Sequence, residues 1–516
     1  CLDALFTLSA ADPASLRDEL IELQRLARAS ESSSANQIAR QWWVSRGRQT
    51  GPYRLALLAR DPRQLARLAE QARAADHLNS HADIESRERI FAPSTSTPPS
   101  PGRIAFVFPG SGNQFGDMGR ELALQWPDVL RAQDGENARL ASQMLVDRFW
   151  NGPLAPELLS DHRALICGQV CFGTMGADLA ARFGLKPDAA IGYSLGESTA
   201  LLALRAWRQR DEMLERLGQS PLFAQDLAGR PETLRRRWNM PEDQPVEWVT
   251  GMVERSAEAA RAAIGEGKRA YVLISNTPNE CVIGGDRVAV DEVVAALGCL
   301  WFPLQGVSTV HCELARPVRQ AYRELHRFDT TPPAGVEFYS CALGRTYVPE
   351  REASADAIEA QAMDTVDFPR VIHAAYDAGV RTFIEVGAGG SCSRMIGKIL
   401  EGRPHFAKSL AIAGPDPVTH FLRTLGQLHA EGVPVDLEMP YGGEEDVEHP
   451  LRASSRAPGK CVTVSITGAP FIAPALPARP LPEELAENDF GHAVLQAMSA
   501  AERATIEAHE AYLRFS

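Results

Sequence analysis

The residues Gly192-Tyr193-Ser194-Leu195-Gly196 form a GxSxG motif between an apolar segment and a segment of helical character. Small residues on both sides of the serine permit a tight strand-to-helix turn, which raises the Ser194 hydroxyl above the edge of a sheet. Such a turn also directs the Leu195 N–H and the positive end of the helix toward an oxyanion forming at Ser194. In this context the motif predicts a nucleophilic serine; the alternative is a chance match in a glycine-rich protein.

A serine nucleophile requires a base, and the chain offers 12 histidines. His311 lies in the segment STVHCELARPV. On spacing alone, His311 is not preferred over His162 or His373, and any one of the three is equally typical of a surface or core histidine.

A glycine-rich turn, Phe108-Pro109-Gly110-Ser111-Gly112-Asn113-Gln114, follows the apolar segment that begins at Arg103. Such turns present backbone N–H groups to anions. The spacing matches neither a phosphate-binding loop nor a dinucleotide-binding GxGxxG. The turn is therefore either an anion-binding element or an ordinary exit from a strand.

The elements that must position these residues alternate between strands and helices. Apolar segments at 103–110, 188–192 and 382–390 each end in glycines, with helical segments between them. This alternation predicts an α/β fold with a parallel sheet, similar to the core of α/β-hydrolases. In residues 246–308 the predicted elements follow a different order: strand, helix, strand, strand, helix, strand, with a hairpin around Thr277-Pro278. This order predicts an inserted ferredoxin-like subdomain.

The ends of the chain differ from this core. Residues 1–100 predict a small α/β linker domain that ends in a proline-rich segment, Ser94–Gly102. Residues 436–516 predict a linker followed by a last helix at 501–515. The expected divisions are therefore 1–100, 101–245, 246–308, 309–435 and 436–516, with the two middle ranges 101–245 and 309–435 forming one large subdomain around the insertion.

Composition narrows the function classes. The chain has 516 residues, 53 Lys and Arg, 66 Asp and Glu, and a net charge of −13, which argues against binding nucleic acid by bulk electrostatics. No secretory signal is evident, and the uncharged stretch 461–478 contains three prolines, so it predicts a linker rather than a membrane span. The nine cysteines form no CxxC pair, which favours reduced thiols in the cytoplasm and no metal site. A first residue Cys1 suggests a piece of a longer protein.

Several segments together resemble one family. The segments FVFPGSGNQFGDMG, IGYSLGESTALLAL, ISNTPNECVIGGD, VHCELARPV and FIEVGAGGSCSRM resemble, in order, the motifs of malonyl-CoA:acyl-carrier-protein transacylases. An ordered set is more specific than any single motif. Residues 1–100 also resemble the linker between ketosynthase and acyltransferase, so the chain resembles an acyltransferase region of a polyketide or polyunsaturated-fatty-acid type synthase.

The resemblance implies roles. Ser194 would be the nucleophile and His311 the base and then the acid. The backbone N–H groups of Ser111 and Leu195 would form the oxyanion hole, and the main-chain carbonyl of Asp367 would orient His311. The implied reaction moves an acyl group from coenzyme A to the phosphopantetheine thiol of an acyl carrier protein, with no permanently bound cofactor. The implied partners are the carrier protein and neighbouring synthase domains such as a ketosynthase, with no nucleic acid and no membrane.

Four residues are expected at the substrate: Tyr193, Gln219, Asn276 and Val310. Tyr193 stands where the family usually has histidine, beside the pocket. Gln219 stands, in an ungapped comparison, where malonyl-specific members carry an arginine that pairs with the substrate carboxylate, and Arg216 lies one turn away. Because a buried carboxylate without a partner is costly, the resemblance leaves both malonyl and an uncharged acyl group, such as acetyl, as substrates.

Two rival functions remain at this level. A serine esterase or thioesterase would use the same Ser194 but hydrolyse the acyl-enzyme. A non-catalytic docking region would use residues 1–100 and 436–516 to hold neighbouring domains. For an acidic carrier protein, the candidate docking cations are Arg205, Arg208 and Arg210, or Arg235, Arg236 and Arg237.

Overall fold

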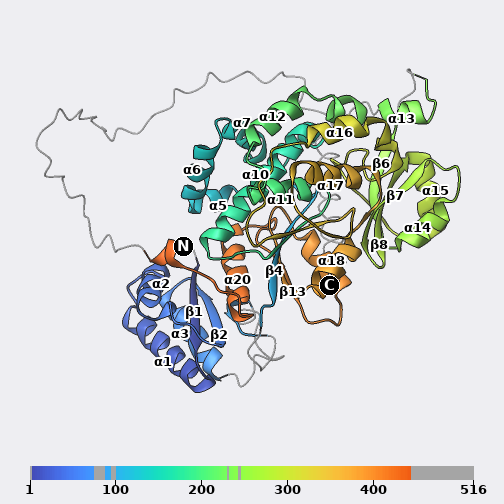
Figure 1. The fold of residues 1–516 in the computed structure, drawn as a ribbon. Helices are drawn as coiled ribbons and strands as arrows, with labels where there is room; N and C mark the ends of the chain where they lie inside the picture. Colours follow the sequence, from blue (N-terminus) through green and yellow to red (C-terminus); the bar gives the residue numbers. More distant parts are fainter. Residues whose placement is uncertain (1–2, 75–87, 94–99, 229–231, 242–245, 443–516) are drawn as a thin grey trace, which may run out of the picture. The chain divides into compact units, whose positions relative to one another are not determined.

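The structure is a computed structural model that describes residues 3–74, 88–93, 100–228, 232–241 and 246–442, drawn in colour in Figure 1. All of these belong to one compact unit. The helix predicted at 501–515, the predicted C-terminal linker from residue 443 onward, and most of the proline-rich segment at 94–102 lie outside the described residues.

A six-stranded sheet forms the centre of the large subdomain, in the order β11-β10-β5-β4-β13-β14. Neighbouring strands are parallel except for β11, which pairs antiparallel with β10. The strands are β4 (Arg103–Phe108), β5 (Ala189–Gly192), β10 (Glu337–Ser340), β11 (Arg345–Tyr347), β13 (Val380–Glu385) and β14 (Phe406–Ser409). The predicted α/β class with a parallel sheet is confirmed.

The register of β4 and β5 fixes where the two glycine-rich turns meet. Phe108 pairs with Gly192, so both strands reach the same edge of the sheet together. The turn that contains Ser111 and the turn that contains Ser194 therefore leave the sheet side by side, as expected for the carboxyl ends of adjacent parallel strands.

Two helices lie directly behind these turns: α10 (His162–Arg182) and α11 (Gly196–Ala203). By length and hydropathy α10 would suffice to cross a membrane, but 83% of its apolar window is buried inside the protein. It is a core helix, and Cys167 and Cys171 are buried in it. The other helices of this subdomain are α5 (Arg120–Gln125), α6 (Pro127–Glu136), α7 (Leu140–Met144), α8 (Val146–Phe149), α9 (Pro156–Leu159), α12 (Arg210–Gln219), η2 (Leu222–Asp226), α13 (Glu232–Arg237), η3 (Glu313–Val318), α16 (Arg319–Leu325), α17 (Arg351–Met363), α18 (Phe368–Asp377), α19 (Ser391–Ile399), α20 (Pro417–Ala430) and α21 (Glu438–Tyr441).

A second sheet stands apart from the first, at the right of Figure 1. Its elements are β6 (Trp248–Val253), α14 (Ala257–Ile264), β7 (Ala270–Thr277), β8 (Glu280–Asp286), α15 (Arg287–Leu297) and β9 (Trp301–Pro303). The strand order β7-β8-β6-β9, antiparallel throughout, is the order of a ferredoxin-like unit. A short strand from later in the chain, β12 (Val366–Asp367), joins the edge of this sheet parallel to β7, which the sequence did not reveal.

The N-terminal residues form a three-stranded antiparallel sheet of β1 (Ala4–Ala10), β2 (Tyr53–Ala59) and β3 (Ile90–Phe91). Its helices are α1 (Pro13–Ala29), α2 (Ala35–Trp42), η1 (Trp43–Gly47) and α3 (Pro62–Ala74). These strands and helices form the small α/β arrangement that was expected for residues 1–100.

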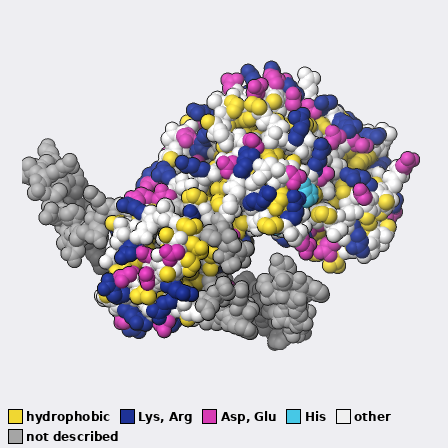
Figure 2. Space-filling view, turned by 60° about the horizontal axis from the view of Figure 1, so that its bottom comes forward, with side chains coloured by type: hydrophobic (Ala, Val, Ile, Leu, Met, Phe, Trp, Pro, Cys, Tyr) yellow, Lys and Arg dark blue, Asp and Glu magenta, His cyan; other side chains and the backbone are white. Residues whose placement is uncertain are grey.

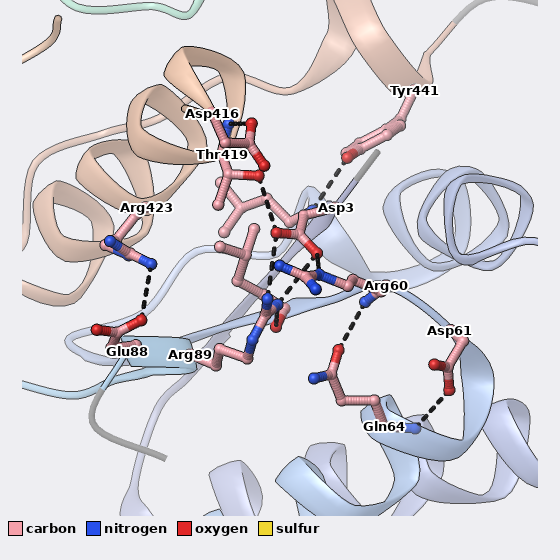
Figure 3. A network of polar contacts seen from close by, with 12 residues as sticks. Asp3, Arg60, Asp61, Gln64, Glu88, Arg89, Asp416, Thr419, Arg423 and Tyr441 are labelled. Atoms are coloured by element: carbon pink, nitrogen blue, oxygen red, sulfur yellow. Dashed lines mark hydrogen bonds and ion pairs between the residues drawn. The ribbon is translucent and has the colours of Figure 1, made fainter. Parts of the chain in front are cut away.

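A buried polar network joins this N-terminal sheet to the last helices (Figure 3). The Asp3 carboxylate accepts hydrogen bonds from Arg60, Arg89 and the Thr419 hydroxyl. The Tyr441 hydroxyl accepts from the Leu5 N–H at 3.0 Å. These contacts attach the N-terminal sheet to α20 and α21.

Candidate active site

The Ser194 turn has the geometry of a nucleophile elbow. Ser194 has a φ of 56°, in the left-handed region that non-glycine residues rarely adopt. A Cβ on Gly192 would overlap the Glu197 backbone, and a Cβ on Gly196 would overlap the Phe108 carbonyl. The two glycines therefore let β5 turn sharply into α11 against β4, and the strained residue between them is Ser194.

The structure brings His311 to this serine. The Ser194 Oγ lies 2.7 Å from His311 Nε2, although the residues are 117 positions apart in sequence. His311 also has a positive φ, of 64°, and its N–H donates to the Ala362 carbonyl at 2.7 Å. Of the other candidates, His373 Nδ1 contacts Arg403 and His162 opens α10, and neither lines the cavity at Ser194.

The main-chain carbonyl that holds His311 belongs to Gln361, near the end of α17. It lies 2.5 Å from His311 Nδ1. An N–H at Nδ1 donates to this carbonyl, which leaves Nε2 free to accept the Ser194 proton. The prediction of Asp367 is wrong: Asp367 lies on β12 beside Ser275, and its carboxylate caps α18 by accepting from the Arg370 N–H.

The electrostatic environment keeps His311 neutral. Burial lowers its pKa to about 4, and the hydrogen bond to the Gln361 carbonyl offsets only part of this effect. A neutral imidazole with Nε2 at the serine hydroxyl is the form required of a general base.

The Gln361 side chain braces the same turn. Its Nε2 donates to the Ser194 carbonyl at 3.1 Å, and its Oε1 is buried without a partner among the described residues. One residue thus holds His311 by its main chain and the nucleophile turn by its side chain. No motif in the sequence marked Gln361.

Ser111 and Leu195 are the two residues whose N–H groups were predicted to form the oxyanion hole. Both line the cavity that contains Ser194 and His311. A Cβ on Gly110 would lie within 3.0 Å of the Ser194 Cβ, so the turn before Ser111 approaches the nucleophile closely. The turn is held by its own polar groups: Asn113 Nδ2 donates to the Gly110 carbonyl, and the Gly112 N–H donates to Gln114 Oε1.

The cavity beside Ser194 contains about 760 Å³ of space between atoms, part of which is open solvent at its mouth. Its walls are mostly apolar and aromatic, and Val310, which was expected at the substrate, is among the lining residues. The described lining residues are Ser111, Ile166, Val170, Ser194, Leu195, Ser198, Trp207, Met213, Leu217, Phe223, Ser308, Val310, His311, Tyr322, Leu325, His326, Phe328 and Gln361.

Tyr193 and Asn276 are not among the described residues that line this cavity, and their predicted substrate contacts stay predictions. The Tyr193 hydroxyl donates to Asn276 Oδ1 at 2.7 Å, and Asn276 Nδ2 donates to Glu280 at 3.1 Å. Glu280 is in turn paired with Arg394. Adjacent residues in a tight turn point in different directions. Tyr193 packs edge-on against Phe368, and this contact links the two sheets.

Gln219 is also misplaced by the prediction. It is exposed at the end of α12, where its amide donates to Glu215 at 3.2 Å. Met213 and Leu217 are the α12 residues that face the cavity. Gln219 follows Leu217 by two positions, which is about 200° around a helix, so it must point away.

Arg216 does not supply the missing charge. Its guanidinium lies over the Phe328 ring at 4.3 Å from the centroid and donates to the Arg327 carbonyl at 2.9 Å. It also pairs with Glu212. Phe328 lines the cavity whereas Arg216 does not.

Of the two arginine clusters, one is not an exposed patch. Arg205 pairs with Glu136 and Asp178, and Arg210 is buried, donating to Gln133 and to Cys171 Sγ. Arg236 and Arg237 on α13 are exposed. Figure 2 shows basic and acidic side chains interspersed over the visible face, without one large basic area.

Comparisons with known proteins show which sequences and folds the chain resembles. No family model matches the chain. The chain is 27% identical over 337 residues to the malonyl CoA-acyl carrier protein transacylase of Bacillus subtilis, covering 63% of this chain and 97% of that protein. It is 26% identical over 360 residues to the polyketide synthase GfsA of Streptomyces halstedii, covering 66% of this chain but only 4% of that much longer protein.

Among solved structures, the acyltransferase domain from module 8 of the salinomycin polyketide synthase superposes with a TM-score of 0.65 at 20% identity. The match covers 84% of this chain and 97% of that domain. The chain therefore has the fold of polyketide synthase acyltransferase domains, and the predicted resemblance in sequence to malonyl-CoA:acyl-carrier-protein transacylases is confirmed.

Proposed function

We propose that this chain transfers an acyl group from coenzyme A to the phosphopantetheine thiol of an acyl carrier protein, through an ester on Ser194. The observation that carries the proposal is the 2.7 Å contact between Ser194 Oγ and His311 Nε2 at the wall of an apolar cavity. The similarity to a protein named as an acyl carrier protein transacylase supports the choice of acceptor.

In the first half-reaction, His311 Nε2 accepts the Ser194 proton as the oxygen attacks the thioester carbonyl. The carbon–sulfur bond then breaks, His311 returns the proton to the departing CoA thiolate, and an acyl-serine remains. The N–H groups of Ser111 and Leu195 are proposed to hold the oxyanion, and each such donor contributes about 3 kcal/mol in comparable sites.

In the second half-reaction, a phosphopantetheine thiol gives its proton to His311 and attacks the ester carbonyl, which releases Ser194 with its proton restored. No permanently bound cofactor is needed. We propose that the chain works in the cytoplasm as part of a longer polyketide or fatty-acid synthase, beside domains such as a ketosynthase.

The experiment that tests this function separates transfer from hydrolysis. The protein is incubated with radiolabelled acyl-CoA and a holo-carrier protein, and loaded carrier and free acid are both quantified. We expect carrier loading to exceed acid release, and Ser194→Ala to abolish both. Acid release without loading would indicate a thioesterase, and the absence of any turnover would favour a non-catalytic docking region.

A further inference from the structure

The walls of the cavity bear on which acyl group enters it. Aromatic side chains of Trp207, Phe223, Tyr322 and Phe328 form much of the apolar wall. Aliphatic side chains from α10 and α12, including Met213 and Leu217, complete it. The polar lining groups are hydroxyls, one amide and two imidazoles, and no Lys or Arg occurs among the described residues that line the cavity.

No positively charged side chain reaches the cavity wall among the described residues. Arg216 is engaged behind the Phe328 ring by the Arg327 carbonyl and Glu212. His326 stacks on Tyr322 with ring centroids 4.7 Å apart, and its Nδ1 lies 2.8 Å from the Tyr322 carbonyl. Burial lowers the pKa of His326 to about 4, as it does for His311, so both imidazoles are neutral at pH 7.

We propose that this cavity selects uncharged acyl groups with an apolar body larger than acetyl, and rejects malonyl-type groups that carry a free carboxylate. The inference rests on the proposed acyl transfer by Ser194. A carboxylate entering these walls would lose its water and gain no cation, which disfavours its binding strongly. A methylene entering them is favoured by about fourfold in affinity.

The direct test compares butyryl-CoA and malonyl-CoA, whose acyl groups are similar in size and differ in charge. Rate constants for acylation of the wild-type chain are measured by intact-mass spectrometry, with acetyl-CoA as a shorter uncharged reference. We expect butyryl to acylate at least about 100-fold faster than malonyl and faster than acetyl. Malonyl acylation as fast as butyryl would overturn the inference and leave acyl transfer standing, whereas no adduct with any acyl-CoA would contradict the proposed function itself.

A substitution tests whether the charge of the cavity wall determines which acyl group reacts with Ser194. Leu217→Arg places a guanidinium on the face of α12 that lines the cavity, and it should raise malonyl acylation at least tenfold while lowering butyryl acylation. Leu217→Met changes the shape without adding charge and should give no gain with malonyl. Circular dichroism establishes whether each variant is folded. A folded Leu217→Arg protein with an unchanged preference for butyryl over malonyl would contradict the inference. If Leu217→Arg does not fold, the comparison of acyl-CoAs on the wild-type chain tests the inference alone.

Discussion

Ser194 and His311 are both held in a conformation that their residue types disfavour. Their φ angles are 56° and 64°, and a non-glycine residue in this region costs about 1–3 kcal/mol. The surrounding structure holds this strain: Gly192 and Gly196 admit the turn at Ser194, and the Ala362 and Gln361 carbonyls fix His311. Strain at two residues that touch each other supports a functional role for the pair.

The pH dependence of acylation follows from the burial of His311. Its pKa is lowered to about 4, so the imidazole is neutral and able to accept a proton above that pH, and protonated below it. We expect kcat/KM for the acyl-CoA to stay level from pH 8 down to about pH 5 and to fall through about pH 4. An acid limb centred near the ordinary histidine value of 6.5 would contradict this assignment.

Only part of the site could be predicted at the residue scale. The glycines around Ser194 marked the nucleophile because a tight turn requires them, whereas His311 was distinguished only by the family resemblance. The orienting carbonyl was assigned to Asp367 and belongs to Gln361, because a main-chain contact leaves no signature in residue type. Tyr193 was expected beside the pocket because it precedes the nucleophile in sequence. Adjacency in sequence does not fix the direction of a side chain, and the Tyr193 hydroxyl donates to Asn276.

At the scale of elements, the sharp connection from β5 to α11 depends on Gly196. A Cβ there would overlap the Phe108 carbonyl of the neighbouring strand, so the turn would have to shift. We expect Gly196→Ala to lower acylation by at least 100-fold and to lower the melting temperature. Gly218→Ala is the matched control: no atom lies within 4 Å of its Cβ, and the exchange should stabilise α12 by up to about 1 kcal/mol.

The helix α13 carries the remaining candidate contact for a carrier protein. Arg236 and Arg237 are exposed there, and α13 packs against η3, which follows His311. We expect reversal of both charges to glutamate to raise KM for an acidic carrier about tenfold while acylation by acyl-CoA stays unchanged. Reversal of Arg25 and Arg28 on α1, which are 78% and 61% exposed, is the control. Equal effects of the two pairs would exclude α13 as the docking site.

Helical phase explains another failed prediction at this scale. The ungapped comparison assigned Gln219 to the substrate, but the face of α12 that lines the cavity is defined by Met213 and Leu217. A shift of two positions in alignment reverses the face of a helix. Without the contacts of α12, the sequence did not show which residue the cavity would meet.

At the scale of the whole molecule, the predictable strands were those marked by an apolar run and a glycine-rich turn after it. The buried strands β4, β5 and β13 were found from apolar runs that end in glycine. The strands β10, β11 and β14 have only three or four residues each, too short for a periodic pattern. The strand β12 joins a sheet whose other strands all precede it, a tertiary pairing that local sequence does not encode.

The attachment of the N-terminal sheet depends on Asp3, whose side chain is 1% exposed. Asp3→Ala would leave Arg89, only 9% exposed, without its carboxylate, and loss of one partner of a buried pair costs about 3 kcal/mol or more. We expect a matching loss in the free energy of unfolding, measured by urea denaturation. Glu31→Ala, which removes a pair whose side chains are 59% and 81% exposed, should change it by less than about 1 kcal/mol. Equal losses would show that Asp3 does not anchor the sheet.

The most direct measurement is the site of the acyl group after incubation of the chain with butyryl-CoA and malonyl-CoA in turn. Peptide mass mapping should find one butyryl group per chain, on the peptide that contains Ser194, and little malonyl group under the same conditions. The adduct should be absent from Ser194→Ala, formed at least about 1,000-fold more slowly by His311→Ala, and lost when a holo-carrier protein is added. An adduct on another residue, or one that persists in Ser194→Ala, would contradict the account.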